Sequence, residues 1–299
     1  MLLLVRYGEI GVKSTPVRRR FEDRLIERLD EVLAFHGLDG AVSREEGRIF
    51  VDVADDVAAD AAVAAAQTPG VVSVSPVRRT GLDLDAIAAT AVELLEDRDV
   101  PSFAIDARRA GDHDYTSEEV EETVGAAVQD ELELAVDLED PAATVRVEAR
   151  YKYAYLSTTT VDGVGGLPVN RDARVAVLMT DRASTVAAFL LMKRGCSVYP
   201  VYTGEETDAV RKEIAVLRQY DPAVKLTVRG EDPARALDTV CDLYKCGAAA
   251  APATAGELGD GLDLGREVLY PNAGLSEEEV LDRYAEIQAV PHPAPSKLL

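Results

Sequence analysis

Tryptophan is absent from the 299 residues, and the chain has only three cysteines and three histidines. So few thiols, unevenly spaced, exclude the disulfide framework of small secreted domains. The dispersed histidines form no catalytic triad, and no second Cys or His pair stands at the spacing of a zinc site. We therefore expect no metal centre in this chain.

Long apolar runs are missing as well. No stretch of about 18 apolar residues occurs, so we expect no membrane-spanning helix. Residues 1–10 are apolar only briefly, and they lack the positive segment and small-residue cleavage site of a signal peptide. This pattern indicates a strand at the start of the chain and a cytoplasmic protein.

Lysine is scarce: seven Lys stand beside 25 Arg, against 54 acidic residues, and the formal net charge is −22. Taken alone, this charge argues against nucleic acid as a partner. However, the same balance is typical of proteins in a high-salt cytoplasm, where the Debye length falls to about 3 Å at 1 M salt. Local basic clusters therefore say more about partners than the net charge does.

The first part of the chain alternates between strand-like and helix-like patterns. Phe21, Leu25 and Leu29 recur at helical spacing, and Pro16 stands where a first-turn proline is tolerated. The expected order is strand, helix, strand, helix, strand, over residues 2–7, 17–35, 48–53, 57–67 and 71–77. This order is typical of a small ferredoxin-like α+β domain.

A second group of elements follows. Thr116 and Glu119 have the spacing of a capping box, which marks the start of a helix. The expected elements are a helix, a strand, a helix and two paired strands, over residues 84–96, 102–108, 116–136, 145–150 and 153–159. The glycine-rich segment 162–168 is the best boundary, so we divide the chain into residues 1–77, 78–165 and 166–299.

The third part begins with a strand, a crossover helix and a strand, over residues 174–178, 184–194 and 196–202. This βαβ unit predicts a parallel sheet. A helix at 207–220, a strand at 225–229 and a helix at 276–287 follow. The alanine-rich segment 248–254 is expected to be a loop, and the proline-rich tail 291–299 to be frayed.

Basic residues cluster within the first 155 positions. They are Arg18, Arg19, Arg20, Arg24 and Arg28; Arg78 and Arg79; Arg108 and Arg109; Arg150 and Lys152. Arginine forks match phosphates bidentately, although scattered solvated arginines would give a similar count. Three tyrosines alternate nearby and could stack on bases, but packing is the favoured interpretation: Tyr151, Tyr153 and Tyr155.

Three phrases in order resemble the tRNA 4-thiouridine synthetase (tRNA sulfurtransferase, ThiI) family over roughly residues 1–205. They are Tyr7–Ile10 with Lys13 and Phe21-Glu22, then Gly165–Val169, then Val186–Cys196. The resemblance, with the composition, points to a halophilic archaeon. It implies a ferredoxin-like domain, a THUMP domain and an α/β PP-loop-like domain with a Rossmann-like parallel sheet, within the boundaries given above.

The resemblance also implies a function. The first two domains would grip tRNA through Lys13, Arg18, Arg19, Arg20, Arg24, Arg108, Arg109 and Lys152. The third would adenylate a uridine with ATP and magnesium, and a separate sulfur-transfer or thiolation protein would deliver sulfur as a persulfide. A homodimer is a further expectation.

One motif departs from the family. Where the family has Ser-Gly-Gly-x-Asp-Ser after the strand, this chain has Met179–Ser184, without either glycine. The backbone then cannot approach a phosphate closely, so we interpret the PP-loop as degenerate and expect no cofactor. The remaining nucleotide candidates are Thr180, Arg182, Ser184 and Lys193. Cys241 and Cys246 are weak catalytic candidates, with idle thiols the favoured interpretation.

Three hypotheses follow. The leading one is a tRNA-binding THUMP protein that supports 4-thiouridine modification without family-type ATP chemistry. The second is an active ATP-dependent tRNA sulfurtransferase with a rebuilt nucleotide loop, which would use ATP and magnesium. The third is a protein–protein adaptor that does not bind RNA.

Overall fold

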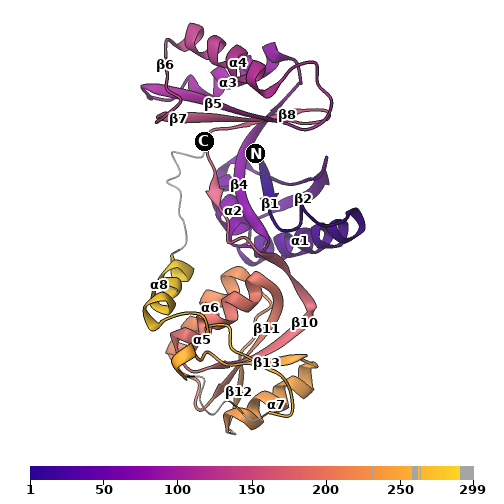
Figure 1. Cartoon of the computed structure of the whole chain (residues 1–299), viewed down its shortest axis with the longest axis vertical. Coiled ribbons are helices and arrows are strands. Elements are labelled where there is room, and N and C mark those ends of the chain that lie inside the picture. The colour runs from indigo at the N-terminus through magenta and orange to yellow at the C-terminus, as the bar shows by residue number, and fades with distance from the viewer. Residues whose placement is uncertain (231, 258–261, 263, 290–299) are drawn as a thin grey trace.

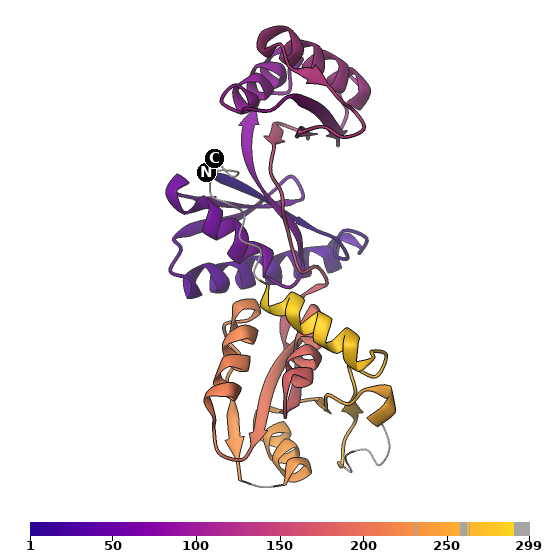
Figure 2. The same ribbon diagram turned by 90° about the vertical axis from the view of Figure 1, so that its left-hand side faces the viewer.

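The computed structural model describes residues 1–230, 232–257, 262 and 264–289. The expected frayed tail at 291–299, with His292, lies outside these residues. Three bodies are stacked along the long axis of the molecule (Figures 1 and 2). No helix in the described ranges is long and apolar enough to cross a membrane.

The first domain packs two helices on one face of an antiparallel sheet. Its elements are β1 (Leu2–Tyr7), α1 (Thr15–Phe35), β2 (Gly40–Glu45), β3 (Arg48–Val53), α2 (Ala58–Ala66) and β4 (Val71–Thr80). Leu25 and Leu29 of α1 are fully buried against Leu3 and Val5 of β1, as their spacing predicts. The predicted elements are confirmed, but β2 was missed because its largely exposed residues carry little apolar alternation.

The second domain repeats this arrangement with its helices on the far side. Its elements are α3 (Leu84–Leu95), β5 (Ser102–Arg109), α4 (Ser117–Leu132), β6 (Ala135–Val136), β7 (Ala143–Ala149) and β8 (Ala154–Ser157). The chain then returns to the first domain as β9 (Val161–Asp162). The capping box of Thr116 and Glu119 is confirmed at the start of α4. The predicted pair of strands is also confirmed, because β7 and β8 pair antiparallel.

A single strand joins the two domains. The first part of β4 pairs with β1, and its last residues, Arg78–Thr80, pair with β8. The two sheets are therefore one path of strands in the order β2-β3-β1-β4-β8-β7-β5-β6, with β9 on β4. In Figure 1 the helices α3 and α4 lie above this path and α1 lies below it, so neither pair covers the inner faces between the domains.

The third domain is a five-stranded parallel sheet in the order β12-β11-β10-β13-β14. Its elements are β10 (Leu167–Met179), α5 (Arg182–Lys193), β11 (Arg194–Thr203), α6 (Asp208–Tyr220), β12 (Thr227–Arg229), α7 (Pro233–Tyr244), β13 (Ala248–Ala250), β14 (Val268–Leu269) and α8 (Glu277–Gln288). The predicted α/β class is confirmed. Odd-numbered residues of β10 pack against α5, α6 and α8, while Ala176 and Leu178 pack against α7.

One expectation for this domain is wrong. The alanine-rich segment was assigned to a loop, but Ala248–Ala250 form β13, which pairs in parallel with β10. Alanine has low strand propensity, so the local pattern is weak. The strand forms because both faces are covered: Ala249 packs beneath α7, Ala250 packs on the opposite face, and both are fully buried beside β10.

Close backbone contacts fix the passage from the second domain to the third. Gly166 has a φ of +80°, and an added Cβ would collide with the carbonyl oxygen of Lys193 at the end of α5. Gly70 donates its amide to the carbonyl of Gly165 at 2.8 Å. The glycines predicted as a boundary are therefore required by the geometry of the junction.

Candidate functional site

Between the first and second domains, two sheet faces that no helix of either domain covers lie opposite one another. On β7, Val145 and Val147 pack under α3 and α4, so Arg146 and Glu148 point to the opposite face. On β1 the same alternation places Arg6 on the face away from the helices. We call this surface the interdomain face, defined by Arg6, Arg48, Arg108, Arg146, Glu148 and Arg150.

Glu148 is the hub of this face. Its carboxylate accepts from Arg6 at 2.5 Å and from Arg48 at 3.2 Å, and Arg150 lies 3.8 Å away. Burial alone would raise the pKa of Glu148, but the guanidinium groups of Arg6 and Arg48 outweigh it and lower the pKa. Because three guanidinium groups share one carboxylate, this face keeps an excess of positive charge in a chain whose net charge is −22.

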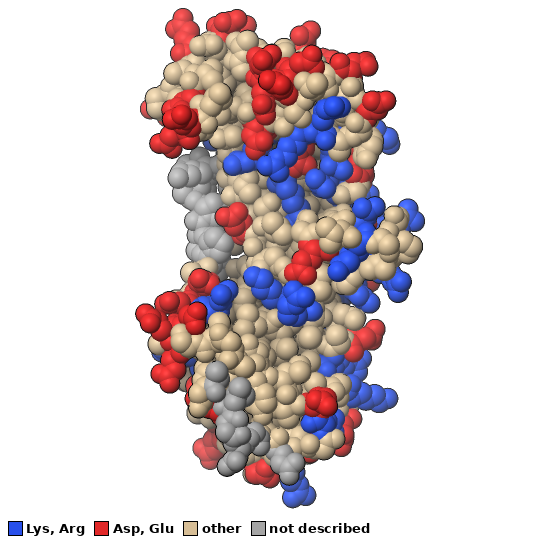
Figure 3. All heavy atoms as spheres, viewed as in Figure 1, with Lys and Arg blue, Asp and Glu red and all other residues tan. Residues whose placement is uncertain are grey.

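The interdomain face is hollowed in two places. A small cavity of about 160 Å³ has three guanidinium groups and two carboxylates in its lining: Arg6, Arg108 and Arg146, with Asp106 and Glu148. A larger one of about 710 Å³ extends toward Arg78 and also includes Arg146. Arg146 has no acidic partner in the described part of the chain, and Arg108 is 80% exposed with only a 3.7 Å contact to Asp106. Figure 3 shows Lys and Arg gathered where the two domains meet.

Of the residues predicted to bind tRNA, Arg108 and Arg109 lie at the end of β5 as expected, and Arg108 lines the small cavity. Lys152 is exposed in the turn between β7 and β8. The nearby tyrosines differ among themselves. Tyr155 is buried and packs on Phe50 at 4.9 Å, as expected, whereas Tyr151 is 62% exposed, so its assignment to packing is wrong.

The remaining predicted residues lie on or just before α1. Lys13, Arg19 and Arg20 are exposed. Arg18 lies 3.8 Å from the buried carboxylate of Glu22, which also accepts from the hydroxyl of Tyr7. Arg24 lies over the ring of Phe21 at 5.5 Å. Arg28, counted above as part of the same basic cluster, is instead buried between the first and third domains.

Sequence reasoning missed most of the interdomain face. Arg6, Arg48, Arg146 and Glu148 were not singled out. A signal was present in the segment Val145–Arg150, where charged residues alternate with apolar ones and must share one face of a strand. Arg6 and Arg48 carry no such signal, because their partner Glu148 is distant in the chain.

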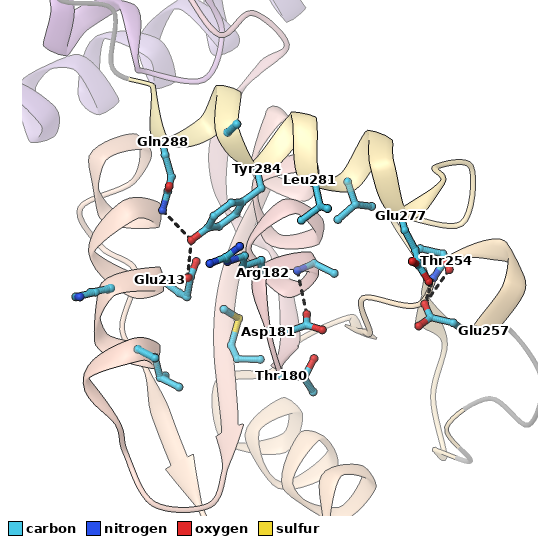
Figure 4. A pocket seen from close by; sticks show the side chains of 17 residues that line it. Thr180, Asp181, Arg182, Glu213, Thr254, Glu257, Glu277, Leu281, Tyr284 and Gln288 are labelled. Carbon is cyan, nitrogen blue, oxygen red and sulfur yellow. Dashed lines mark hydrogen bonds between the residues drawn. The ribbon is translucent and has the colours of Figure 1, made fainter.

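The second candidate site lies at the carboxyl ends of β10 and β13. A cavity of about 1070 Å³ opens there, between α6, α8 and the segments that follow the two strands. In open α/β sheets, ligands bind where neighbouring connections leave the sheet in opposite directions, and β10 is such a point. Figure 4 shows α8 along one wall, where Tyr284 donates to Glu213 at 2.6 Å and Arg182 lies beneath its ring.

The amino end of α5, where a phosphate would be cradled, is already capped by the chain itself. One oxygen of Asp181 accepts from the amides of Ala183 at 2.9 Å and Ser184 at 3.4 Å. The hydroxyl of Ser184 accepts in return from the amide of Thr180 at 2.8 Å. A carboxylate therefore already occupies the amides from which a phosphate at this helix end would accept.

The lining of this cavity carries more negative than positive charge. Four carboxylates and two cations line it: Asp181, Glu213, Glu257, Glu277, Arg182 and Lys212. The predicted nucleotide residues are not all brought together. Thr180 and Arg182 line the cavity, whereas Ser184 is fully buried beneath it. Lys193 ends α5 and does not line the cavity, since the helix is about 18 Å long.

The two candidate thiols lie on the other side of the sheet. Cys241 of α7 is fully buried and Cys246 is 6% exposed, in the apolar cluster around Ala176 and Leu178. Cys241 contacts the carbonyl of Ala248 at 3.7 Å. A hydrogen bond with Cys246 lowers the pKa of the Cys241 thiol and raises that of its partner. Neither thiol lines the large cavity.

No grouping of His, Cys, Asp and Glu that could hold a metal ion is found in the ranges that the structure describes. His36 caps the end of α1, as expected. His113 stacks on Tyr115 with ring centres 5.3 Å apart. These two histidines therefore have structural partners.

Comparisons with known proteins agree with this architecture. Residues 2–75 match the ThiI ferredoxin-like domain family, and residues 82–159 match the THUMP domain family. A protein named probable tRNA sulfurtransferase from Halobacterium salinarum is 39% identical over 250 residues, which are 79% of this chain and 63% of that protein. One of the same name from Methanosarcina acetivorans is 41% identical over 210 residues, 67% of this chain and 50% of that one.

The chain thus spans less than two thirds of the length of these relatives. Among solved structures, PH1313 from Pyrococcus horikoshii superposes with a TM-score of 0.83 at 26% identity, covering 96% of this chain and 99% of that one. A 4-thiouridine synthetase crystallised with RNA and bound ATP superposes with a TM-score of 0.76 at 21% identity, covering 96% and 84%. The chain therefore carries the ThiI ferredoxin-like and THUMP domains and is related to the tRNA sulfurtransferase (ThiI) family.

Proposed function

We propose that this protein binds tRNA on the interdomain face and supports tRNA 4-thiouridine modification without ATP chemistry of its own. The observation that carries the proposal is the excess of guanidinium groups around Glu148, in the hollow between a ThiI ferredoxin-like domain and a THUMP domain. Arginine forks suit RNA phosphates. The 4-thiouridine modification is inferred from the relatives, which are named probable tRNA sulfurtransferase.

The absence of ATP chemistry rests on α5. Asp181 holds the amides that a phosphate would need, and four carboxylates line the cavity beside it. A partner protein would then activate the uridine and deliver the sulfur. On this proposal neither ATP nor magnesium is a cofactor of this chain, and its buried thiols take no part in sulfur transfer.

The test is tRNA binding by fluorescence anisotropy at several salt concentrations. We expect an Arg108→Gln/Arg146→Gln variant to bind tRNA about tenfold more weakly. The slope of log affinity against log salt concentration should become shallower by about one for each phosphate that is no longer neutralised. Arg235→Gln, on the exposed surface of α7, is the matched control and should bind as the wild type does. Equal affinity of all three proteins would reject the interdomain face as the tRNA site, and no tRNA binding by the wild type would favour a protein–protein adaptor.

A second function is favoured by one observation, the 1070 Å³ cavity at the carboxyl edge of β10 and β13. There an active sulfurtransferase would bind ATP through Thr180 and Arg182. Calorimetry with ATP, magnesium and tRNA separates the two functions. We expect to detect no heat of ATP binding. Micromolar ATP binding that Arg182→Gln abolishes would instead show that the protein is an active sulfurtransferase.

A further inference from the structure

A fourth cavity lies between α1 of the first domain and the start of β10 in the third domain. It measures about 280 Å³, and its cationic and amide lining consists of Arg20, Arg24, Arg28, Asn170 and Arg171. Arg20, Arg24 and Arg28 are four residues apart, so they lie along one side of α1. In Figures 1 and 2, α1 runs along the border with the third domain.

Arg28 is the unusual member of this set. Its side chain is 9% exposed, and Nη2 contacts Glu31 at 3.1 Å and Glu27 at 3.3 Å. The Nε and Nη1 atoms are buried and have no hydrogen-bond partner among the described residues. Buried donors of a charged group are rarely left without an acceptor, so these two atoms indicate one that the chain does not supply.

The neighbouring carboxylates do not provide that acceptor. Glu31 and Asp221 are engaged by Arg171, at 2.6 Å each. Asp23, which also lines the cavity, is bound by Arg44 at 2.9 Å. Glu27 is 66% exposed and contacts only Nη2 of Arg28, and Asp172 completes the acidic lining.

The cavity therefore holds a guanidinium group whose donors are not all bound to an acceptor. Burial lowers the pKa of Arg28, and the nearby positive charge of Arg171 lowers it further. Arg20 has no ion pair in the part of the chain that is described, and Arg24 contacts only the ring of Phe21. An anion with several acceptor oxygens would satisfy the free fork of Arg28 and relieve its repulsion with Arg171.

We propose that this cavity is a phosphate-binding site in which Arg28 supplies the central fork and Arg20 and Arg24 close the outer side. The phosphate belongs either to an RNA backbone or to a small phosphate-bearing molecule. The RNA source rests on the proposed function: a backbone held here would pass from the first domain onto the third. The free-phosphate source is independent of it.

The experiment titrates inorganic phosphate into the full chain by calorimetry and, in parallel, measures tRNA affinity by anisotropy. Arg28→Lys keeps the charge but loses the fork, and we expect phosphate to bind it about tenfold more weakly. Arg24→Gln, at the outer side, should lose about threefold. Arg235→Gln, exposed on α7 and not lining the cavity, is the control and should match the wild type in both measurements.

The outcomes separate the two sources. Weaker binding of tRNA by both cavity variants supports an RNA phosphate, and weaker binding of phosphate alone supports a small molecule. The proposal is overturned if wild type and both variants bind phosphate and tRNA equally. It is also overturned if calorimetry detects no phosphate binding and the variants keep the tRNA affinity of the wild type. Should wild type bind no tRNA, the proposed function fails, and the phosphate titration alone decides this site. Unfolding curves show whether Arg28→Lys folds, and Arg24→Gln carries the test if it does not.

Discussion

Asp181 uses a single carboxylate to close the amino end of α5. It is the N-cap residue of the helix and forms a capping box with Ser184. Replacement of Asp181 by Ala should lower the free energy of unfolding by about 1 kcal/mol, because two amides lose their acceptor. Chemical denaturation measures this loss. Thr116→Ala, which breaks the capping box of α4 in the second domain, is the matched comparison and should lower the free energy of unfolding by a similar amount.

The same variant also bears on the cavity beside α5. Asp181→Ala frees the amides but restores neither glycine, so it should not gain affinity for ATP in calorimetry. A gain of tenfold or more would show that this carboxylate alone prevents phosphate binding, and it would contradict the role given to the missing glycines.

Glu148 is the second residue whose replacement should change stability by a measurable amount. Glu148→Gln leaves Arg6, Arg48 and Arg150 without a compensating charge, so at pH 7 it should lower the free energy of unfolding by about 3 kcal/mol. The folded-state pKa of Glu148 lies below its ordinary value of 4.5. Its contribution is therefore complete above pH 4.5 and is lost as the pH falls through the folded-state pKa.

Urea denaturation between pH 7 and pH 3 measures this dependence. The difference between wild type and Glu148→Gln should shrink as the pH falls below 4.5. Glu122→Gln, an exposed substitution on α4, should differ little from wild type at every pH. A difference for Glu148→Gln that stayed constant with pH would mean that shape, not charge, makes this residue important.

These residues show what local pattern reasoning can reach. The position of Asp181 at the amino end of α5 was predictable, since a strand and an amphipathic helix flank it. The role of Glu148 was not, because its partners Arg6 and Arg48 lie 142 and 100 positions away along the chain. Such ion pairs depend on sheet order, which the sequence of any one strand does not contain.

At the scale of elements, the connection between the second and third domains depends on two adjacent glycines with different surroundings. Gly165 has a φ of +69° and open space around it, whereas a Cβ on Gly166 would meet the backbone of Lys193. Gly165→Ala should cost about 1 kcal/mol from backbone strain. Gly166→Ala should cost about 2–3 kcal/mol more, because α5 or β10 must shift.

Thermal unfolding of the two variants tests this comparison, and each serves as the control for the other. Equal costs would mean that the junction relaxes freely and that Gly166 is required only for its positive φ. Apart from the exposed β2 and the two-residue strands β6 and β9, the order of strands and helices could be predicted as far as β12 from periodicity and turn residues. The short strand β13 could not, because burial in the sheet, not propensity, makes it a strand. The strand β14 has only two residues, too few to form a pattern.

At the scale of the whole molecule, two ion pairs among the described residues connect the first domain to the third. Arg171 of β10 binds Glu31 of α1 at 2.6 Å and the buried carboxylate of Asp221 at 2.6 Å. Arg194 binds Glu9 at 3.0 Å, but both side chains are largely exposed. Neither connection was predictable, since each joins residues from separately predicted domains.

The two pairs should differ in energy because their solvation differs. Arg171→Met leaves Asp221 buried without its partner and should lower the free energy of unfolding by about 3 kcal/mol, while loosening α1 from β10. Arg194→Gln should cost less than about 1 kcal/mol, as exposed pairs do. Denaturation measures the energies, and small-angle scattering should show a larger radius of gyration only for Arg171→Met. If both variants keep the wild-type radius, packing alone holds the first and third domains together, and a phosphate site between α1 and β10 would not need the Arg171 pair to stay in place.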